Sequence, residues 1–86
     1  MAPESLRIDK LLWHLRLTKS RSLAQALVAA GHVRVNGRRV EKSSVEVKTG
    51  DSVTIPDGDG AFAFQLTAIP PRRGPTAEAL ACYREI

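Results

Sequence analysis

The sequence predicts an α+β fold in which two N-terminal helices pack on a small antiparallel sheet and a short helix follows near the end. Three observations support this prediction. Apolar residues within 8–15 are spaced as on one side of a helix. The alanine-rich segment 20–31 has the same period. From Val33 onward the period changes to two, and turn residues such as those at 36–37 separate the apolar segments.

The first helix is expected from about Arg7 to Leu17. Its apolar residues, at positions 8, 11, 12 and 15, form one stripe. At about 100° of rotation per residue, Arg7, Lys10 and His14 fall together on a different, outward side. This side of the helix is therefore expected to be cationic.

The second helix is expected to begin at Arg21 with Ser20 as its N-cap, and to end at Gly31 in a left-handed conformation. The residues expected to point inward are Leu23, Ala24, Leu27 and Val28.

Five strands and a last helix are expected after the second helix. The strands are predicted at about residues 33–35, 38–40, 45–47, 53–55 and 62–69. Residues 70–75 are rich in proline and are expected to form an extended linker. Thr76 is then expected to cap a short helix that contains Leu80 and Tyr83.

Composition indicates one soluble domain. A chain of 86 residues has room for a modest core and none for a second, catalytic domain. No apolar run approaches the roughly 18 residues of a membrane helix and no secretory signal is present, so the cytoplasm is the expected location. The single cysteine, Cys82, fits a reducing compartment and is expected to be buried.

The charge is segregated along the chain. Residues 1–48 contain ten Lys and Arg against four Asp and Glu, whereas residues 49–86 contain three against five. A region of one sign attracts a polyanion, so nucleic acid is the leading expected partner, ahead of an anionic membrane.

The order of motifs is similar to that of a known RNA-binding domain. Its elements are Arg7-Ile8-Asp9-Lys10-Leu11-Leu12, Ser20-Arg21 followed by Ala24 and Leu27-Val28, Gly31-His32-Val33-Arg34-Val35-Asn36-Gly37, and Gly50-Asp51 before Val53. Together they resemble the S-four RNA-binding domain, named for the fourth protein of the small ribosomal subunit, over about residues 7–55. The resemblance implies an S-four-like domain at 1–69, and a linker and helix at 70–86. It also implies that RNA contacts helix one, the start of helix two and the nearby hairpin.

The segment 72–79, ending near Tyr83, and Leu12-Trp13 further resemble the stand-alone ribosome-associated heat shock protein fifteen family of bacteria. That resemblance implies binding to the RNA of the large ribosomal subunit, with an adjoining peptidyl-tRNA, in ribosome rescue or quality control. One departure is that the chain stops at Ile86, where family members commonly continue with a basic helical tail.

The junction Lys19-Ser20-Arg21 is the strongest candidate phosphate site, because two cations flank a helix N-terminus that already favours anions. The alternative is a capped helix whose cations point into water.

Other candidate RNA-binding residues also have structural alternatives. Arg16 could instead be a packing residue, and Gln25 could instead be an ordinary surface residue. Asp9 is expected to hold Arg7 or Arg21 in place. Alternation is expected to put Arg34 and Arg38 or Arg39 on differing faces of the hairpin. The full expected RNA-binding set is Arg7, Lys10, Arg16, Lys19, Ser20, Arg21, Gln25, Arg34, Arg38, Arg39 and Lys42.

No metal, cofactor or catalytic site is predicted. His14 and His32 lack ligand spacing, and the acidic turn 57–60 has Ala68 where a calcium loop needs glutamate. Trp13 is expected to complete the core or contact the last helix, with stacking on a base as the alternative. We expect a monomeric, non-enzymatic RNA binder that uses neither DNA nor a membrane. Two alternatives stay open: the RNA-targeting module of an enzyme such as a pseudouridine synthase, and a module for an acidic protein partner.

Overall fold

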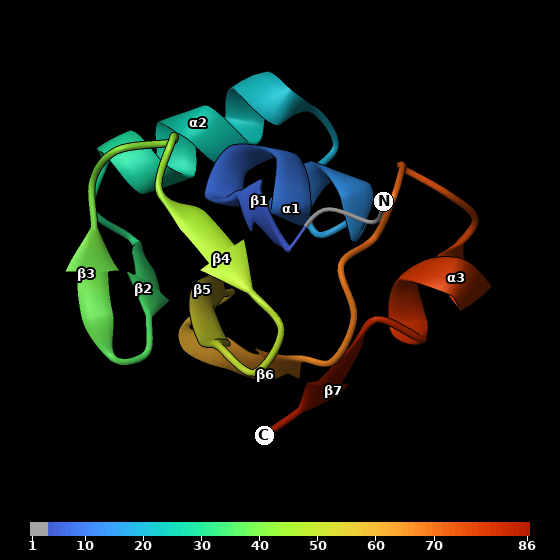
Figure 1. The fold of residues 1–86 in the computed structure, drawn as a ribbon. Coiled ribbons are helices and arrows are strands. Elements are labelled where there is room, and N and C mark those ends of the chain that lie inside the picture. Colours follow the sequence, from blue (N-terminus) through green and yellow to red (C-terminus); the bar gives the residue numbers. More distant parts are fainter. Residues whose placement is uncertain (1–3) are drawn as a thin grey trace.

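The computed structural model describes residues 4–86, so residues 1–3 of the predicted domain lie outside it. Helices α1 (Ile8–His14) and α2 (Arg21–Ala29) lie side by side and cover one face of the strands β5 (Ser52–Asp57) and β6 (Gly60–Leu66) (Figure 1). The predicted α+β class is confirmed.

Helix α1 is shorter than predicted, because the chain turns sharply after it. Arg16 adopts a left-handed conformation with φ of 61°. Its backbone N–H bonds the carbonyl of Trp13, and the N–H of Leu17 bonds the carbonyl of Leu12. This pair of bonds is the Schellman ending of a helix, so residues 15–17 leave the helical path although their spacing continues the pattern.

Helix α2 begins and ends as predicted. The Ser20 hydroxyl accepts a hydrogen bond from the backbone N–H of Leu23, and Gly31 follows the helix with φ of 79°. Ala24 and Val28 are buried, as expected. The inward prediction for Leu23 is wrong: its side chain is 50% exposed.

The main sheet has five antiparallel strands in the order β3-β2-β5-β6-β7. The predicted hairpin is confirmed as β2 (Val33–Val35) and β3 (Arg38–Val40), joined by Asn36 and Gly37, which both have positive φ. Strand β6 ends at Leu66, three residues before the predicted end. Strand β4 (Glu46–Lys48) does not join this sheet, and instead pairs with β1 (Ser5–Arg7) in a separate two-stranded ladder.

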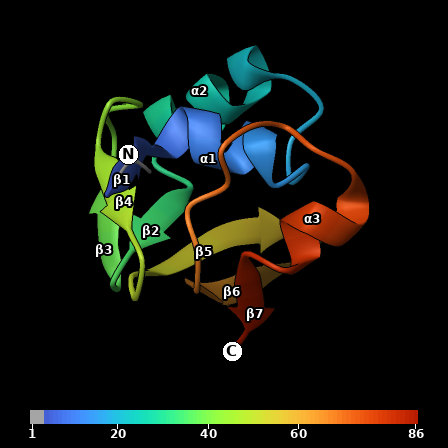
Figure 2. The same cartoon turned by 45° about the vertical axis from the view of Figure 1, so that its right-hand side comes forward.

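The C-terminal segment returns to the main sheet. Pro75 occupies the N-cap position of α3 (Thr76–Leu80), so the predicted cap by Thr76 is wrong. Tyr83 is not helical, because it belongs to β7 (Tyr83–Glu85), the edge strand beside β6 (Figure 2). There its ring packs on Phe64, with 5.0 Å between the ring centroids. The pairing with β6 and this aromatic contact both involve residues too far away in the sequence for local periodicity to predict.

One core joins the helices to the main sheet. Cys82 packs against this core but is only half-buried, so its predicted burial is only partly met. The predicted boundary at residue 69 stays a prediction. The buried apolar side chains are Ile8, Leu11, Leu12, Leu15, Ala24, Val28, Val33, Val47, Val53, Ile55, Phe64, Leu66 and Ala79.

Candidate nucleic-acid interface

A buried carboxylate, Asp9, organises the polar contact between the two helices. It is fully buried in the first turn of α1 and accepts hydrogen bonds from Arg7 Nε and Nη2, both at 3.1 Å. It also accepts from Arg21 Nε at 3.2 Å and from Gln25 Nε2 at 3.0 Å, both on α2. The backbone N–H of Lys10 donates a further bond of 2.8 Å. The predicted structural role of Asp9 is confirmed, with both arginines held at once.

The carboxylate remains ionised in this setting. Burial alone would raise the pKa of Asp9, but the hydrogen bonds from Gln25, Arg7, Arg21 and the Lys10 backbone N–H outweigh it and hold the pKa below its ordinary value. A buried charge is tolerated where it is paired and fully hydrogen-bonded, as here.

Asp9 leaves a cationic surface in front of it. The Arg7 and Arg21 side chains remain 41% and 38% exposed, and the partly exposed Lys10 directly follows Asp9 in α1. Three cations against one anion make this surface positive. Each guanidinium has five N–H donors, so both arginines keep donors for a ligand such as phosphate. We refer to Arg7, Lys10, Arg21 and Gln25 around Asp9 as the helix flank.

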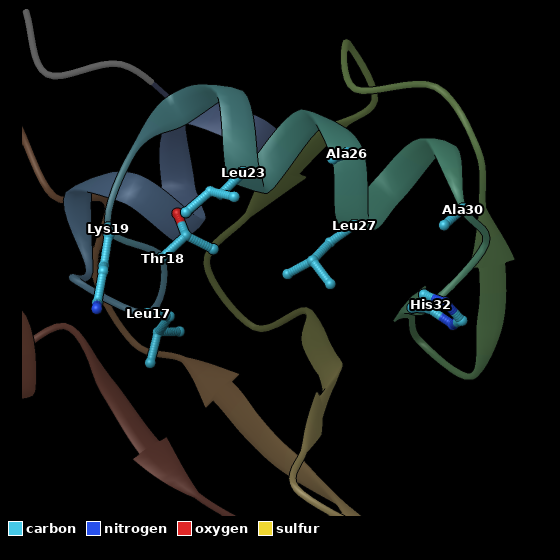
Figure 3. A pocket seen from close by; sticks show the side chains of 8 residues that line it. All are labelled: Leu17, Thr18, Lys19, Leu23, Ala26, Leu27, Ala30 and His32. Carbon is cyan, nitrogen blue, oxygen red and sulfur yellow. The ribbon is translucent and has the colours of Figure 1, made fainter.

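The opposite side of α2 has a different character. At about 100° per residue, Leu23 and Leu27 lie well away from Arg21 and Gln25 around the helix axis. An open, mainly apolar groove of about 640 Å³ follows this side, with Lys19 at one end and His32 at the other (Figure 3). Its lining residues are Leu17, Thr18, Lys19, Leu23, Ala26, Leu27, Ala30 and His32.

The predicted junction Lys19-Ser20-Arg21 is therefore divided. The Ser20 hydroxyl caps α2 with a bond of 3.1 Å to the N–H of Leu23, as expected. Arg21 turns toward Asp9, whereas Lys19 lies beside the groove. The unfavourable placement of Arg21 at a helix N-terminus is offset by the Asp9 carboxylate, which weakens the argument that an anion is needed there.

The end of α1 is tied to the linker. Arg16 Nε donates to the carbonyl of Gly74 at 2.6 Å, and His14 Nδ1 lies 3.4 Å from the carbonyl of Pro70. The guanidinium of Arg73 lies over the Trp13 ring, 5.6 Å from its centroid. Trp13 thus contacts Arg73 of the linker, and the packing alternative for Arg16 has direct support.

The hairpin cations lie on both faces of the sheet. Arg34 pairs directly with Arg39 across the two strands, so these side chains share one face, turned away from the buried Val33. Arg38 pairs with Val35 on the other face. The prediction of differing faces is right for Arg34 and Arg38 and wrong for Arg34 and Arg39. Lys42 is exposed just beyond β3.

Sequence reasoning missed two features of these surfaces. Gln25 was expected either to bind RNA or to be an ordinary surface residue, and its bond to Asp9 was not foreseen. Its position four residues after Arg21, one helical turn on, was the available signal. Arg84 was not singled out, and no local pattern shows that residues 83–85 return to the sheet.

Neither a membrane-spanning helix nor a metal-binding cluster is found within residues 4–86. No helix there is long and apolar enough to cross a membrane. No group of three His, Cys, Asp or Glu in that range is placed to hold a metal ion.

The S4 domain family model matches residues 6–53. The chain belongs to the S4 domain family. The matched range contains both helices, the hairpin and the whole helix flank, so the resemblance found in the motifs is confirmed.

Individual relatives extend the match beyond the S4 domain. The heat shock protein 15 homolog of Haemophilus influenzae is 32% identical over 85 residues, which are 99% of this chain and 64% of the relative. The trimeric structure of Vibrio cholerae heat shock protein 15 is 37% identical with a TM-score of 0.89, covering 96% of this chain and 83% of that one. Small ribosomal subunit protein uS4 of Opitutus terrae is 43% identical over 49 residues, 57% of this chain and 24% of the relative.

The chain spans less than two thirds of the length of the curated heat shock protein 15 relatives. The family and the relatives together support an RNA-binding protein.

Proposed function

We propose that the chain is a non-enzymatic, cytoplasmic RNA-binding protein that contacts structured ribosomal RNA through the helix flank. The RNA belongs to the large ribosomal subunit, with a peptidyl-tRNA adjoining it, and the role is in ribosome rescue or quality control of stalled nascent chains. The heat shock protein 15 relatives and the resemblance in residues 72–79 support this more specific part.

The observation that carries the proposal is the set of bonds at Asp9. One buried carboxylate fixes Arg7 from the chain before α1, and Arg21 and Gln25 from α2. Because these side chains are ordered before RNA arrives, binding loses less side-chain entropy. A fixed array of guanidinium groups suits recognition of phosphates by position and charge.

Five further predicted residues are proposed as peripheral contacts: Arg16, Lys19, Ser20, Arg38 and Lys42. Ser20 caps the start of α2, Lys19 lies just before it at one end of the groove, and Arg38 and Lys42 are exposed at the hairpin. Arg16 is proposed as the weakest contributor because it holds Gly74. With about six cations engaged, log affinity is expected to fall with log salt at a slope of roughly −4 to −5.

A matched pair of double variants tests the flank. Lys10→Gln with Arg21→Gln removes two flank cations, whereas Lys48→Gln with Arg72→Gln removes two exposed cations elsewhere. Binding to large-subunit RNA is followed by fluorescence anisotropy across a salt series. The flank variant is expected to reduce the slope by about 1.5, and the control to leave it nearly unchanged. Equal effects of both variants would contradict a localised site.

Sedimentation tests the ribosomal part. The chain is run through sucrose gradients with intact ribosomes, separated subunits, and large subunits that carry peptidyl-tRNA. Co-migration with the large subunit, strengthened by peptidyl-tRNA, is the expected result. Co-migration with the small subunit alone would overturn the assignment and leave RNA binding intact.

The oligomeric state of the chain is tested separately from its RNA binding. The sequence predicts a monomer, and we keep that proposal for the isolated chain, whereas the Vibrio cholerae relative is trimeric. Sedimentation equilibrium of the chain without RNA gives its mass directly. A mass near 9.4 kDa supports the monomer, and three times that mass supports the trimer.

A further inference from the structure

The main sheet has a second face that the helices do not cover. Residues paired across strands share a face, so the register places Arg39, Arg34, Thr54 and Ala63 in one row across β3, β2, β5 and β6. The next row contains Ser52, Gln65 and Arg84 on β5, β6 and β7. The buried Val33, Val53 and Phe64 point the other way, into the core. We refer to these two rows as the outer sheet face; they are Arg34, Arg39, Ser52, Thr54, Ala63, Gln65 and Arg84.

This face is positive and contains no acid among the described strand residues. Asp57 and Glu85 are on the core side of their strands. Asp57 comes two residues after the buried Ile55, and Glu85 pairs with the buried Phe64. The nearby Asp51 is engaged by Asn36 Nδ2 and by the backbone N–H of Lys48. Three arginines therefore face solvent with no carboxylate between them.

Arg34 and Arg39 bring two like charges to one face of the hairpin, and the Arg39 side chain lies beside Gly31 at the end of α2. Like charges directly opposite on neighbouring strands repel each other and destabilise a sheet. Within residues 4–86 neither arginine has an ion pair, and both are exposed. The helix flank contains a carboxylate between its arginines, and here that counter-charge is missing. A bound polyanion would supply it.

Arg84 is held in place at the far side of the same face. Its Nε and Nη2 donate to Gln65 Oε1 at 3.0 and 2.7 Å. From β3 to β7 there are four steps of about 4.8 Å, so the cations span roughly 19 Å across the strands. Ser52, Thr54 and Ala63 between them are small, which lets a broad ligand approach the backbone closely.

The chemistry of the face favours a duplex over a single strand. Single-stranded RNA is commonly bound by stacking bases on aromatic rings exposed on a sheet. The aromatic rings of β6 and β7, Phe62, Phe64 and Tyr83, all alternate to the core side. Double-stranded RNA is recognised by shape and through phosphates and 2′-hydroxyls, which arginine, serine and threonine can bind.

We propose that the outer sheet face is a second RNA-binding surface, which takes the sugar–phosphate backbone of a double-stranded segment while the helix flank contacts RNA on the other side of the molecule. The proposal does not depend on the helix flank, because the two surfaces share no residue.

The test uses an RNA duplex of about 16 base pairs and an unstructured single strand of the same length. Arg34→Gln with Arg39→Gln is compared with the control Lys48→Gln with Arg72→Gln, and Arg84→Gln is measured alone. The Arg34 and Arg39 variant is expected to lose about tenfold in duplex affinity and about 1.5 in salt slope, with less than about twofold loss on the single strand. Arg84→Gln is expected to lose about threefold on the duplex.

Unchanged duplex affinity and slope in the Arg34 and Arg39 variant would overturn the proposal, as would an equal loss on the single strand. Retained RNA affinity combined with lost sedimentation on ribosomal subunits would also overturn it, since the face would then contact protein. The flank variant is measured in parallel. If that variant binds normally while the sheet variant does not, the proposed flank function fails and this second surface stands.

Discussion

The arginines of the helix flank and those of the outer sheet face are held in opposite ways. Arg7 and Arg21 share a buried carboxylate, so their positions are fixed by the same contacts that join α1 to α2. Arg34 and Arg39 oppose each other across two strands with no carboxylate on their face. On the flank the charges are expected to stabilise the fold, and on the sheet the like charges are expected to oppose it.

Because of this contrast, binding and stability are expected to be coupled differently on the two surfaces. Removing either flank arginine is expected to weaken both RNA binding and stability, because each arginine also donates hydrogen bonds to Asp9. Removing a sheet charge is expected to weaken RNA binding and to strengthen the fold. Measuring both properties in the same variants therefore separates structural arginines from those placed only for a ligand.

The largest effect is expected for Asp9→Asn. The neutral side chain leaves Arg7 and Arg21 without their shared counter-charge inside the helix contact, at a loss of about 2 kcal/mol in the free energy of unfolding. For a domain of this size that corresponds to a melting temperature lower by about 10 °C. RNA affinity is expected to fall as the two guanidinium groups lose their fixed positions. Thermal denaturation measures the melting temperature and anisotropy measures the RNA affinity, with the exposed turn variant Asp59→Asn as control. Wild-type RNA affinity in Asp9→Asn would contradict the role of Asp9 in positioning the two arginines.

Acid is expected to act through the same carboxylate. The pKa of Asp9 is lower in the folded chain than in the unfolded one, so the unfolded state binds the proton first as pH falls. Its contribution to stability is complete above the ordinary carboxyl range and is lost as pH falls from about 4 through the folded pKa. Urea titrations between about pH 7 and pH 2 should show a smaller loss in Asp9→Asn than in the wild type. Parallel curves would mean that other carboxylates control the acid response.

A smaller effect of the same sign is expected for Arg21→Gln. The glutamine can still donate one bond toward Asp9, so about 1 kcal/mol of stability is lost. Gln25 and Arg7 continue to satisfy the carboxylate. Chemical denaturation gives the value, and Ser22→Ala, an exposed change on the same turn, is the control. An unchanged midpoint would show that Arg21 is free of Asp9 in solution.

The smallest effect, with the opposite sign, is expected for Arg34→Gln. Relief of the repulsion with Arg39 should raise stability by about 0.5 kcal/mol, or roughly 3 °C in melting temperature. Arg38→Gln, on the other face of the same hairpin, should show no such gain. Destabilisation by Arg34→Gln would mean that the arginine packs for the fold, and the contrast between the two regions would disappear.

Local signals in the sequence were enough to predict most of the fold. The Ser20 cap, the Gly31 ending and the Asn36-Gly37 turn each act within a few residues, and all three were predicted correctly. The elements that were missed depend on distant partners. Strand β1 pairs with β4 some forty residues later, and β7 pairs with β6, where Tyr83 also packs on Phe64.

The candidate site was predicted in composition more than in arrangement. Charge and motif order selected the cations, and Asp9 was correctly given a structural role. The directions of the side chains were not predictable, because they depend on helix α2 lying against α1. That contact turns Arg21 and Gln25 toward Asp9 and leaves Lys19 beside the apolar groove.

The most direct test of the central claim, that RNA binds the helix flank, is an NMR titration of the ¹⁵N-labelled chain with a ribosomal RNA fragment. Shifts are expected at the Arg7 and Arg21 Nε–H groups and at the Lys10 and Gln25 amides, with a separate set at Arg34 and Arg39 for a duplex. Shifts confined to the groove side of α2, at Leu23 and Leu27 and their neighbours, would contradict the central claim.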